Sequence, residues 1–294
     1  NTANGVTGSG TIGVNSGSTL QLTGALGTTG LVTINTGGVL DLNGQSNTGA
    51  ISLSGTGISS AGALINSSAT AATQSGNVTL AGPTSIGGTG NITISGIISG
   101  SNALTKVAAN TLTLSGANTY TGSTTISAGT LSISAANNLS AAAVTINGGT
   151  LVSTGTATIT NNISIGAGGG TIAAASGQTL TANGVISGSG ALTVGSAGNT
   201  GIVALSAANT YTGSTTISAG TLQLNPGGTI SSSSSIINNA ALVYANNIVN
   251  TSNGVTGSGT IGVNSGSTLK LTGALGTSGL VTINTGGVLD LNGQ

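Results

Sequence analysis

The chain has 294 residues and no net charge, and its four charged residues are Asp41, Lys106, Lys270 and Asp290. It contains no His, Cys, Met, Phe or Trp, so most bases, nucleophiles, metal ligands and disulfides are excluded. Two lysines cannot form the basic surface that nucleic-acid binding requires. No apolar run approaches the roughly 18 residues that would predict a membrane span in this segment.

The remaining composition favours short strands. The 54 glycines are spread along the chain, and each costs a helix interior roughly 1 kcal/mol relative to Ala. Hydrophobic residues make up 37% and are nearly all Ala, Val, Ile and Leu, which predicts a narrow aliphatic core. A neutral chain rich in Thr, Val and Ile is also unlike a disordered one.

The first elements in the chain form a short repeat. Thr11–Gly24 aligns without gaps on Leu31–Gly44, and each copy has two short apolar alternations separated by a Gly-containing corner. Two such strands per repeat describe one turn of a coil, whose turns bury a core by stacking. The predicted ladder in these turns is Ile12, Val14, Leu20 and Leu22 beneath Val32, Ile34, Leu40 and Leu42.

The same unit returns in the middle of the chain. Ala117–Leu131 recurs unchanged as Ala208–Leu222, and Thr125–Leu131 aligns with Thr145–Leu151 one repeat step later. These copies extend the predicted ladder to Ile126, Leu131, Ile146, Leu151, Ile217 and Leu222. We therefore predict an all-β parallel β-helix with about 20–23 residues per turn, roughly 12–14 turns and a length on the order of 60–65 Å.

A longer period joins the two ends of the sequence. Asn1–Gln45 returns as Asn250–Gln294, and the two copies differ at three positions. The sequence thus predicts one unit over 1–249 and the start of the next over 250–294, as part of a longer tandem array.

Polar residues recur at fixed places in the turns. Asn15, Asn35 and Asn147 share one corner, where inward amides could bond to one another along the axis or where Asn could permit a left-handed backbone. These two alternatives stay open.

The middle position of Leu-x-Leu is expected to point outward into solvent. Gln21, Asp41, Lys270 and Asp290 occupy it. Lys270 and Asp290 lie one turn apart and could form a surface ion pair, although such a pair contributes about 0–1 kcal/mol and two solvated side chains are the favoured interpretation.

The sequence offers no constellation for catalysis. Asp41 and Asp290 are copies of one repeat position far apart in the coil, and no His, Cys or Glu accompanies them. We predict no catalytic residue, metal or cofactor. Tyr120 and Tyr211 belong to copies of one repeat, which favours a structural corner over a platform for stacking carbohydrate.

Two stretches carry a family resemblance. Leu104–Leu131 and Leu205–Leu224 resemble the autotransporter-associated β-strand repeat, also called the passenger-associated transport repeat. The resemblance implies a right-handed parallel β-helix that is secreted by a type V pathway and exposed outside a Gram-negative bacterium.

The expected function is a structural extracellular rod or filament segment. Its partners would be neighbouring repeats of the same chain, and its neutral faces could allow lateral self-association. An adhesin module that binds a host cell or a glycan remains the alternative.

Overall fold

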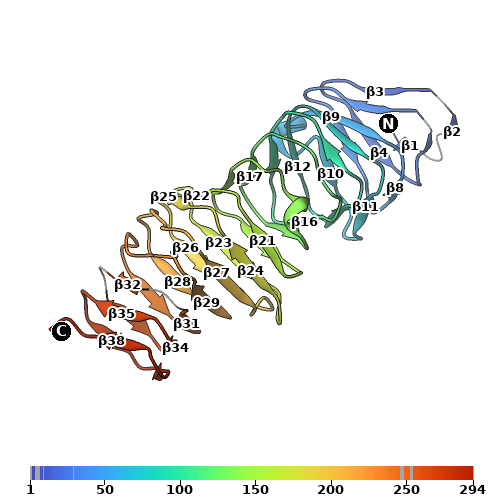
Figure 1. The fold of residues 1–294 in the computed structure, drawn as a ribbon. Coiled ribbons are helices and arrows are strands. Elements are labelled where there is room, and N and C mark those ends of the chain that lie inside the picture. The colour runs from blue at the N-terminus through green and yellow to red at the C-terminus, as the bar shows by residue number, and fades with distance from the viewer. Residues whose placement is uncertain are drawn as a thin grey trace. The chain divides into compact units, whose positions relative to one another are not determined.

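A computed structural model describes residues 2–3, 7–8, 10–28, 30–245, 248–251 and 254–293. The described residues form a β-solenoid of about 13 turns with almost no helix, as the repeats predict. The chain divides into two compact units, unit 1 (Asn1–Ala143) and unit 2 (Val144–Gln294) (Figure 1).

Parallel strands from successive turns build unit 1. One group is β1 (Thr2–Ala3), β4 (Thr19–Leu22), β7 (Val39–Asp41), β10 (Leu64–Asn66), β12 (Val78–Gly88), β15 (Leu104–Lys106) and β17 (Thr124–Ile126). The long strand β12 also pairs with β14 (Ile98–Ser99) and β9 (Ile51–Gly55), and β9 pairs in turn with β6 (Val32–Ile34), which pairs with β3 (Ile12–Val14). A second face consists of β8 (Ser46–Asn47), β11 (Ala72–Gln74), β13 (Ile92–Ile94), β16 (Thr111–Leu114) and β18 (Thr130–Ile133), and a separate pair of β2 (Thr7–Gly8) and β5 (Gly27–Thr28).

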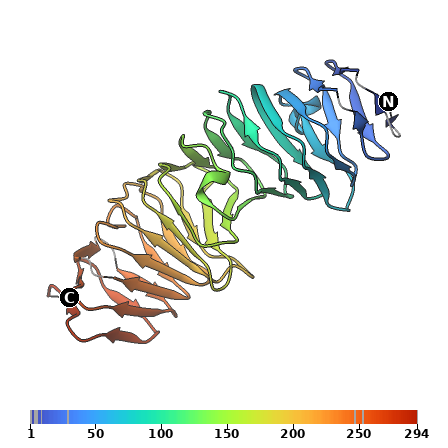
Figure 2. The ribbon, with the colours of Figure 1, turned by 45° about the vertical axis from the view of Figure 1, so that its right-hand side comes forward.

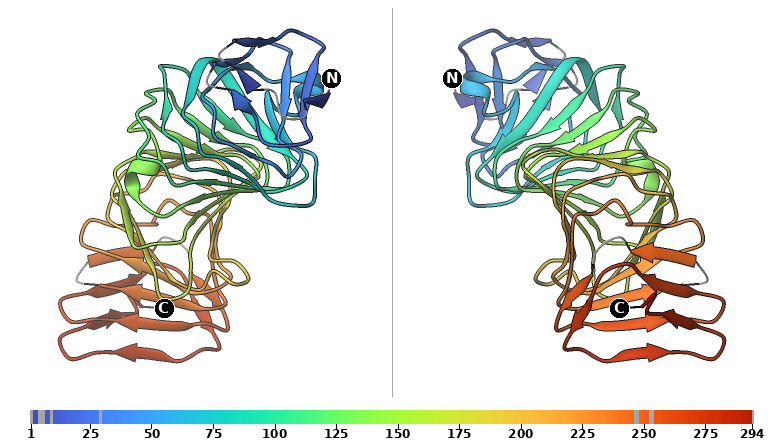
Figure 3. Two further views of the ribbon diagram at one scale, coloured as in Figure 1. Left: turned by 90° about the vertical axis from the view of Figure 1, so that its right-hand side faces the viewer. Right: turned by 90° about the vertical axis from the view of Figure 1, so that its left-hand side faces the viewer.

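Unit 2 repeats this plan with four groups of parallel strands. The first group is β19 (Val144–Ile146), β22 (Ile163–Ile165) and β25 (Ile186–Gly188), and the last is β32 (Ile248–Thr251), β35 (Thr268–Leu271) and β38 (Val288–Asp290). The second group is β20 (Thr150–Ser153), β23 (Gly170–Ala174), β26 (Leu192–Val194), β28 (Thr215–Ile217), β30 (Ile236–Asn238), β33 (Val255–Gly257) and β36 (Leu275–Thr277). The third group is β21 (Ala157–Ile159), β24 (Thr179–Ala182), β27 (Ile202–Leu205), β29 (Thr221–Leu224), β31 (Ala241–Tyr244), β34 (Thr260–Val263) and β37 (Val281–Ile283). Figures 2 and 3 show the strands of each unit lying in successive layers.

The core is a column of aliphatic side chains, because each strand alternates between the two sides of the coil wall. On β16, Leu112 and Leu114 are fully buried while Thr111 and Thr113 are partly exposed. Leu112 stacks between Ile92 of the preceding turn and Leu131 of the next. Apolar burial at about 25 cal/mol per Å² and hydrogen bonds between turns stabilise this arrangement.

Turn length varies at the corners and leaves the strand register intact. Ile34 pairs with Leu53, and Leu53 pairs in turn with Leu80, although the second step along the chain is longer than the first. The longer turn includes the short 3₁₀ helix η1 (Ile58–Ser60), and another, η2 (Ala136–Asn138), lies in a later corner. The turn between Leu53 and Leu80 is therefore longer than the repeats predict.

Glycine is required where turns approach closely. Gly100 has φ +109°, and a Cβ there would lie 2.5 Å from the carbonyl oxygen of Leu80 in the preceding turn. Both the backbone angle and the close contact disfavour any other residue.

The ladder predicts unequal effects of substitutions on one strand. Leu112→Ala should lower the free energy of unfolding by about 2–4 kcal/mol, because it leaves a cavity between Ile92 and Leu131. Thr113→Ala should change it by less than about 0.5 kcal/mol. Urea denaturation of both variants measures the difference, and equal losses would contradict the assignment of inner and outer faces.

Candidate functional site

The described residues contain no cluster of three or more His, Cys, Asp or Glu side chains that could hold a metal ion. No helix in that part of the chain is long and apolar enough to cross a membrane. The features left to consider are the ladder, its polar corners, two buried charges and the surfaces at the two ends.

The structure places the predicted ladder residues in the interior. Ile12 is half-buried at the N-terminal end, and the other thirteen are at most 9% exposed: Val14, Leu20, Leu22, Val32, Ile34, Leu40, Leu42, Ile126, Leu131, Ile146, Leu151, Ile217 and Leu222. Ile12 pairs in register with Val32, and Leu20 with Leu40.

The corner asparagines are outside the core. Asn35 donates its Nδ2 to Oδ1 of Asn15 at 2.8 Å, so the amides of adjacent turns do bond, but both side chains are exposed and the predicted inward orientation is wrong. Asn147, also exposed, accepts a 2.8 Å hydrogen bond from the backbone N–H of Gly168. None of the three has a positive φ, so the left-handed alternative is wrong as well.

Asp41 is buried, contrary to the expectation that it is solvated. It points away from the core between two buried leucines, yet it is 2% exposed because the segment that includes Ser67 covers it. Its Oδ2 accepts from Ser67 Oγ at 2.6 Å and Gln21 Nε2 at 2.8 Å. Its Oδ1 accepts from the backbone N–H groups of Asn43 and Ser67, each at 3.0 Å. The carboxylate therefore joins three turns.

Lys270 and Asp290 occupy the same places in the second copy. They are register partners on β35 and β38, and both are partly exposed. Asp290 accepts a 2.9 Å hydrogen bond from the backbone N–H of Asn292. The ion pair between these two side chains stays a prediction.

Lys106 occupies a ladder position that sequence reasoning missed. It pairs in register with Ile86 below and Ile126 above, and it is 1% exposed. A signal was available, because Leu-Thr-Lys at 104–106 aligns with Leu-Thr-Val at 192–194 in the second copy of this repeat.

The ammonium group of Lys106 is held by oxygen atoms of the corner. Its Nζ donates to the carbonyls of Val107 at 2.6 Å, Ala108 at 2.8 Å and Ala128 at 3.3 Å, and to Oδ1 of Asn110 at 2.8 Å. Ala108 has a left-handed backbone, with φ +64°. Burial lowers the pKa of Lys106 from 10.5 to about 8. The side chain thus ties two turns together and is not exposed for chemistry with a ligand.

The tyrosines are interior residues, so a surface platform for carbohydrate is ruled out at these positions. Tyr120 and Tyr211 are nearly fully buried, and their hydroxyls share short hydrogen bonds with Thr124 at 2.7 Å and Thr215 at 2.6 Å. Burial raises the pKa of both. Tyr244 is fully buried, and its hydroxyl has no partner among the described residues.

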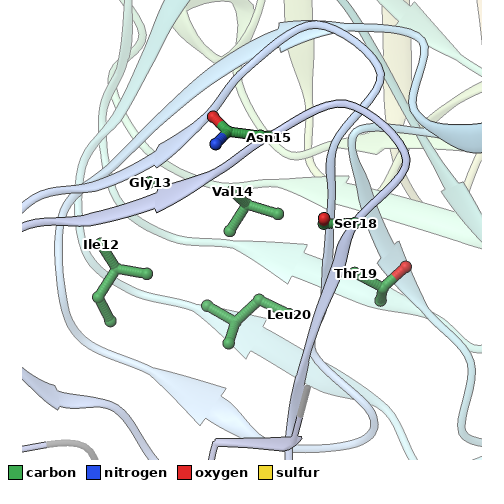
Figure 4. A pocket seen from close by; sticks show the side chains of 7 residues that line it. All are labelled: Ile12, Gly13, Val14, Asn15, Ser18, Thr19 and Leu20. Atoms are coloured by element: carbon green, nitrogen blue, oxygen red, sulfur yellow. The ribbon is translucent and has the colours of Figure 1, made fainter.

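The N-terminal end of unit 1 is hollowed. Ile12, Val14 and Leu20 line a hollow of about 170 Å³ with the corner residues Asn15 and Ser18 (Figure 4). The equivalent residues of the second copy, Ile261, Val263 and Leu269, are at most 1% exposed. In the second copy β31 pairs with the strand that holds these positions, with Leu242 opposite Ile261 and Tyr244 opposite Val263.

The low pKa of Lys106 predicts a pH-dependent stability. Between about pH 8 and 10 the unfolded chain binds more protons at this lysine than the folded chain does, so raising the pH should increase the free energy of unfolding. Lys106→Met should abolish this rise, whereas Thr105→Ala on the same strand should keep it. Denaturation at a series of pH values measures both, and identical profiles for wild type and Lys106→Met would refute the assignment.

The two copies of the aspartate predict different costs for the same substitution. Asp41→Asn should lower the free energy of unfolding by about 1–3 kcal/mol, because donors from Gln21 and Ser67 lose their carboxylate acceptor. Asp290→Asn should cost less than about 0.5 kcal/mol, since its side chain lacks that covering segment. Calorimetry or denaturant titration compares the variants, and similar losses at both positions would exclude a special role for burial.

Comparison with known proteins agrees with the resemblance inferred from the sequence. The family model for the passenger-associated-transport-repeat matches residues 104–133 and 198–224, which include Lys106, Tyr120 and Tyr211. The chain is 38% identical over 151 residues to the adhesin BmaC autotransporter of Brucella suis biovar 1 (strain 1330), a match that covers 50% of this chain and 4% of that protein. No solved structure matches the chain. The chain therefore carries two passenger-associated-transport repeats and is similar, over half of its length, to an autotransporter adhesin.

Proposed function

We propose that this chain is a structural segment of an extracellular, surface-displayed repeat protein, in which the solenoid serves as a rod. The observation that carries the proposal is the aliphatic ladder, which continues from turn to turn within each unit and accounts for most buried side chains. In such a coil the inward side chains are shielded from solvent. Each turn contacts only its neighbours, so the coil lengthens by the addition of turns.

The outer faces support a structural role. Thr93 pairs with Thr113 on neighbouring strands of unit 1, and Thr193 pairs with Thr216 in unit 2, which places small hydroxyl side chains side by side on the outer faces. Two of the four charges are buried, and so are all three tyrosines. The described surface therefore has few of the aromatic and charged groups that dominate tight binding sites.

The likeness to an autotransporter adhesin supports a location outside a Gram-negative cell. It also favours the second candidate, a module that binds a host cell or glycan through these outer faces. Neighbouring turns of the same chain are the partners for which the structure gives contacts, and the neutral faces favour lateral self-association as a further partnership.

Binding and sedimentation experiments on the whole chain separate the two candidates. A structural rod should show no saturable binding to glycan arrays or host cells. In sedimentation it should self-associate as its concentration rises, and to a similar extent at low and high salt, because its faces carry few charges that salt could screen. Saturable binding that Thr93→Arg and Thr113→Arg abolish would instead assign adhesion to this face of unit 1. A chain that remains monomeric at high concentration across salt conditions would exclude lateral association.

A further inference from the structure

The chain contains six Asn-Gly dipeptides, and each is a place where the backbone can react with a side chain. They begin at Asn4, Asn43, Asn147, Asn183, Asn253 and Asn292. The backbone nitrogen of the glycine can attack the side-chain carbon Cγ of the asparagine, and it is accessible because glycine has no Cβ. The pairs at 43, 147 and 183 have described turns on both sides, so their surroundings can be compared.

Hydrogen bonds hold both partners of this reaction at Asn43. The backbone N–H of Gly44 donates to Oδ1 of Asn66 in the next turn at 2.9 Å. The side chain of Asn43 donates its Nδ2 to the carbonyl of Leu22 in the preceding turn, also at 2.9 Å. The attacking nitrogen and the carbon that it must reach are therefore both kept in place.

The same is true of Asn147, although its side chain is exposed. The backbone N–H of Gly148 donates to the carbonyl of Gly169 at 2.7 Å. Oδ1 of Asn147 accepts the 2.8 Å bond from Gly168 described above. Exposure alone therefore does not free an Asn-Gly pair in this coil.

Asn183 has neither restraint. Its side chain is exposed, and among the described residues neither its amide nor the backbone N–H of Gly184 makes a hydrogen bond. The backbone N–H of Asn183 donates to the carbonyl of Ile159 at 2.9 Å, so the corner itself stays attached to the preceding turn. The side chain can thus rotate until Cγ reaches the nitrogen of Gly184.

The corner at Asn183 resembles one in unit 1 where serine takes the same place. Residues 112–116 read Leu-Thr-Leu-Ser-Gly, and residues 180–184 read Leu-Thr-Ala-Asn-Gly. Ser115 and Asn183 are both exposed and each directly follows a strand. A Cβ on Gly116 or Gly184 would lie 2.4 Å or 2.0 Å from a carbonyl oxygen of the preceding turn, so both corners are packed closely. Such a corner does not require asparagine.

We propose that Asn183 is a site of spontaneous deamidation, which slowly adds a negative charge to the outer surface of unit 2. The nitrogen of Gly184 forms a bond to Cγ of Asn183 and loses its proton to solvent, while the bond from Cγ to Nδ2 breaks and ammonia leaves. Water then opens the resulting succinimide ring at one of its two carbonyls. The products are aspartate and isoaspartate, and no oxidant or reductant takes part.

The corner can accommodate both products. Isoaspartate lengthens the main chain by one carbon atom, and turns of this coil already differ in length at their corners without loss of strand register. The backbone N–H groups of Val185 and Ile186, just after the corner, donate to Oδ1 of Asn162 at 3.0 Å and of Asn209 at 2.7 Å. These bonds hold the start of β25 to the turns on either side.

The new charge matters because the chain has so few. Its net charge is zero, and two of its four charged side chains are buried. Deamidation at Asn183 would give a net charge of −1 and place the carboxylate on an exposed side chain. This consequence rests on the proposed function, since like charges on neighbouring rods oppose lateral association.

Rates of deamidation at the three sites test the assignment. The whole chain is incubated in mildly alkaline buffer, quenched in acid and digested with pepsin, and the mass of each peptide is followed with time. Peptides that contain Ser46 separate Asn43 from the identical sequence around Asn292. Asn183 should react about tenfold faster than Asn43 and Asn147, because a hydrogen bond that must break is equivalent to roughly that factor. In concentrated urea the three rates should become similar.

Each part of this comparison can overturn the proposal. Asn183 that reacts no faster than Asn147 in the folded chain, while both react in urea, would show that the free corner has no effect. A difference that persists unchanged in urea would assign it to local sequence instead of structure.

The effect of the charge is tested separately with Asn183→Asp and Asn183→Ser, the second of which copies the corner at Ser115. Sedimentation of fresh protein should show weaker self-association of Asn183→Asp than of Asn183→Ser at low salt, and no difference at high salt. Equal association at low salt would exclude the effect on packing of rods. A wild-type chain that does not associate at all would count against the proposed function, while the deamidation rates would still decide the site.

Discussion

The structure depends on parallel, in-register stacking of short strands, in which inward side chains of successive turns contact one another, as Leu112 does between Ile92 and Leu131. Hydrogen bonds and aliphatic contacts both run between turns, so a single turn has little stability without its neighbours. Because only the strands must keep register, the corners are free to vary. The long step from Leu53 to Leu80 includes a 3₁₀ helix and still places both leucines in the column.

Stacking also governs how the chain tolerates charge. Lys106 takes a ladder position between two isoleucines, and it can stay there because four oxygen atoms at the corner receive its ammonium group. Asp41 takes an outward position and is enclosed by the next turn, where four donors satisfy its carboxylate. Burying either charge without hydrogen-bond partners would be costly. The groups that bond to each charge must therefore stay in place, and this fixes the local geometry around it.

Much of the ladder follows from the short repeat step and the period of two within each strand. Those two regularities assign Leu22, Leu42 and Leu131 to the interior before any coordinates are known, and the repeat at 104–131 indicates the family. The covering of Asp41 could not be predicted in this way, since Ser67 lies in a later corner that has no counterpart in the first turns. Lys106 was missed for another reason. The stretch Leu-Thr-Lys at 104–106 does not form an apolar alternation, and a lysine is rarely buried, so the period of two does not assign position 106 to the interior.

The three tyrosines have a consequence for how this protein can be observed. The chain has no tryptophan, so its near-ultraviolet absorbance and its fluorescence come from Tyr120, Tyr211 and Tyr244, all of them buried. Tyr120 belongs to unit 1 and the other two to unit 2. Tyr120→Phe would leave a chain whose tyrosine signal reports the interior of unit 2, and the double substitution Tyr211→Phe and Tyr244→Phe would leave one that reports the interior of unit 1, without any added label.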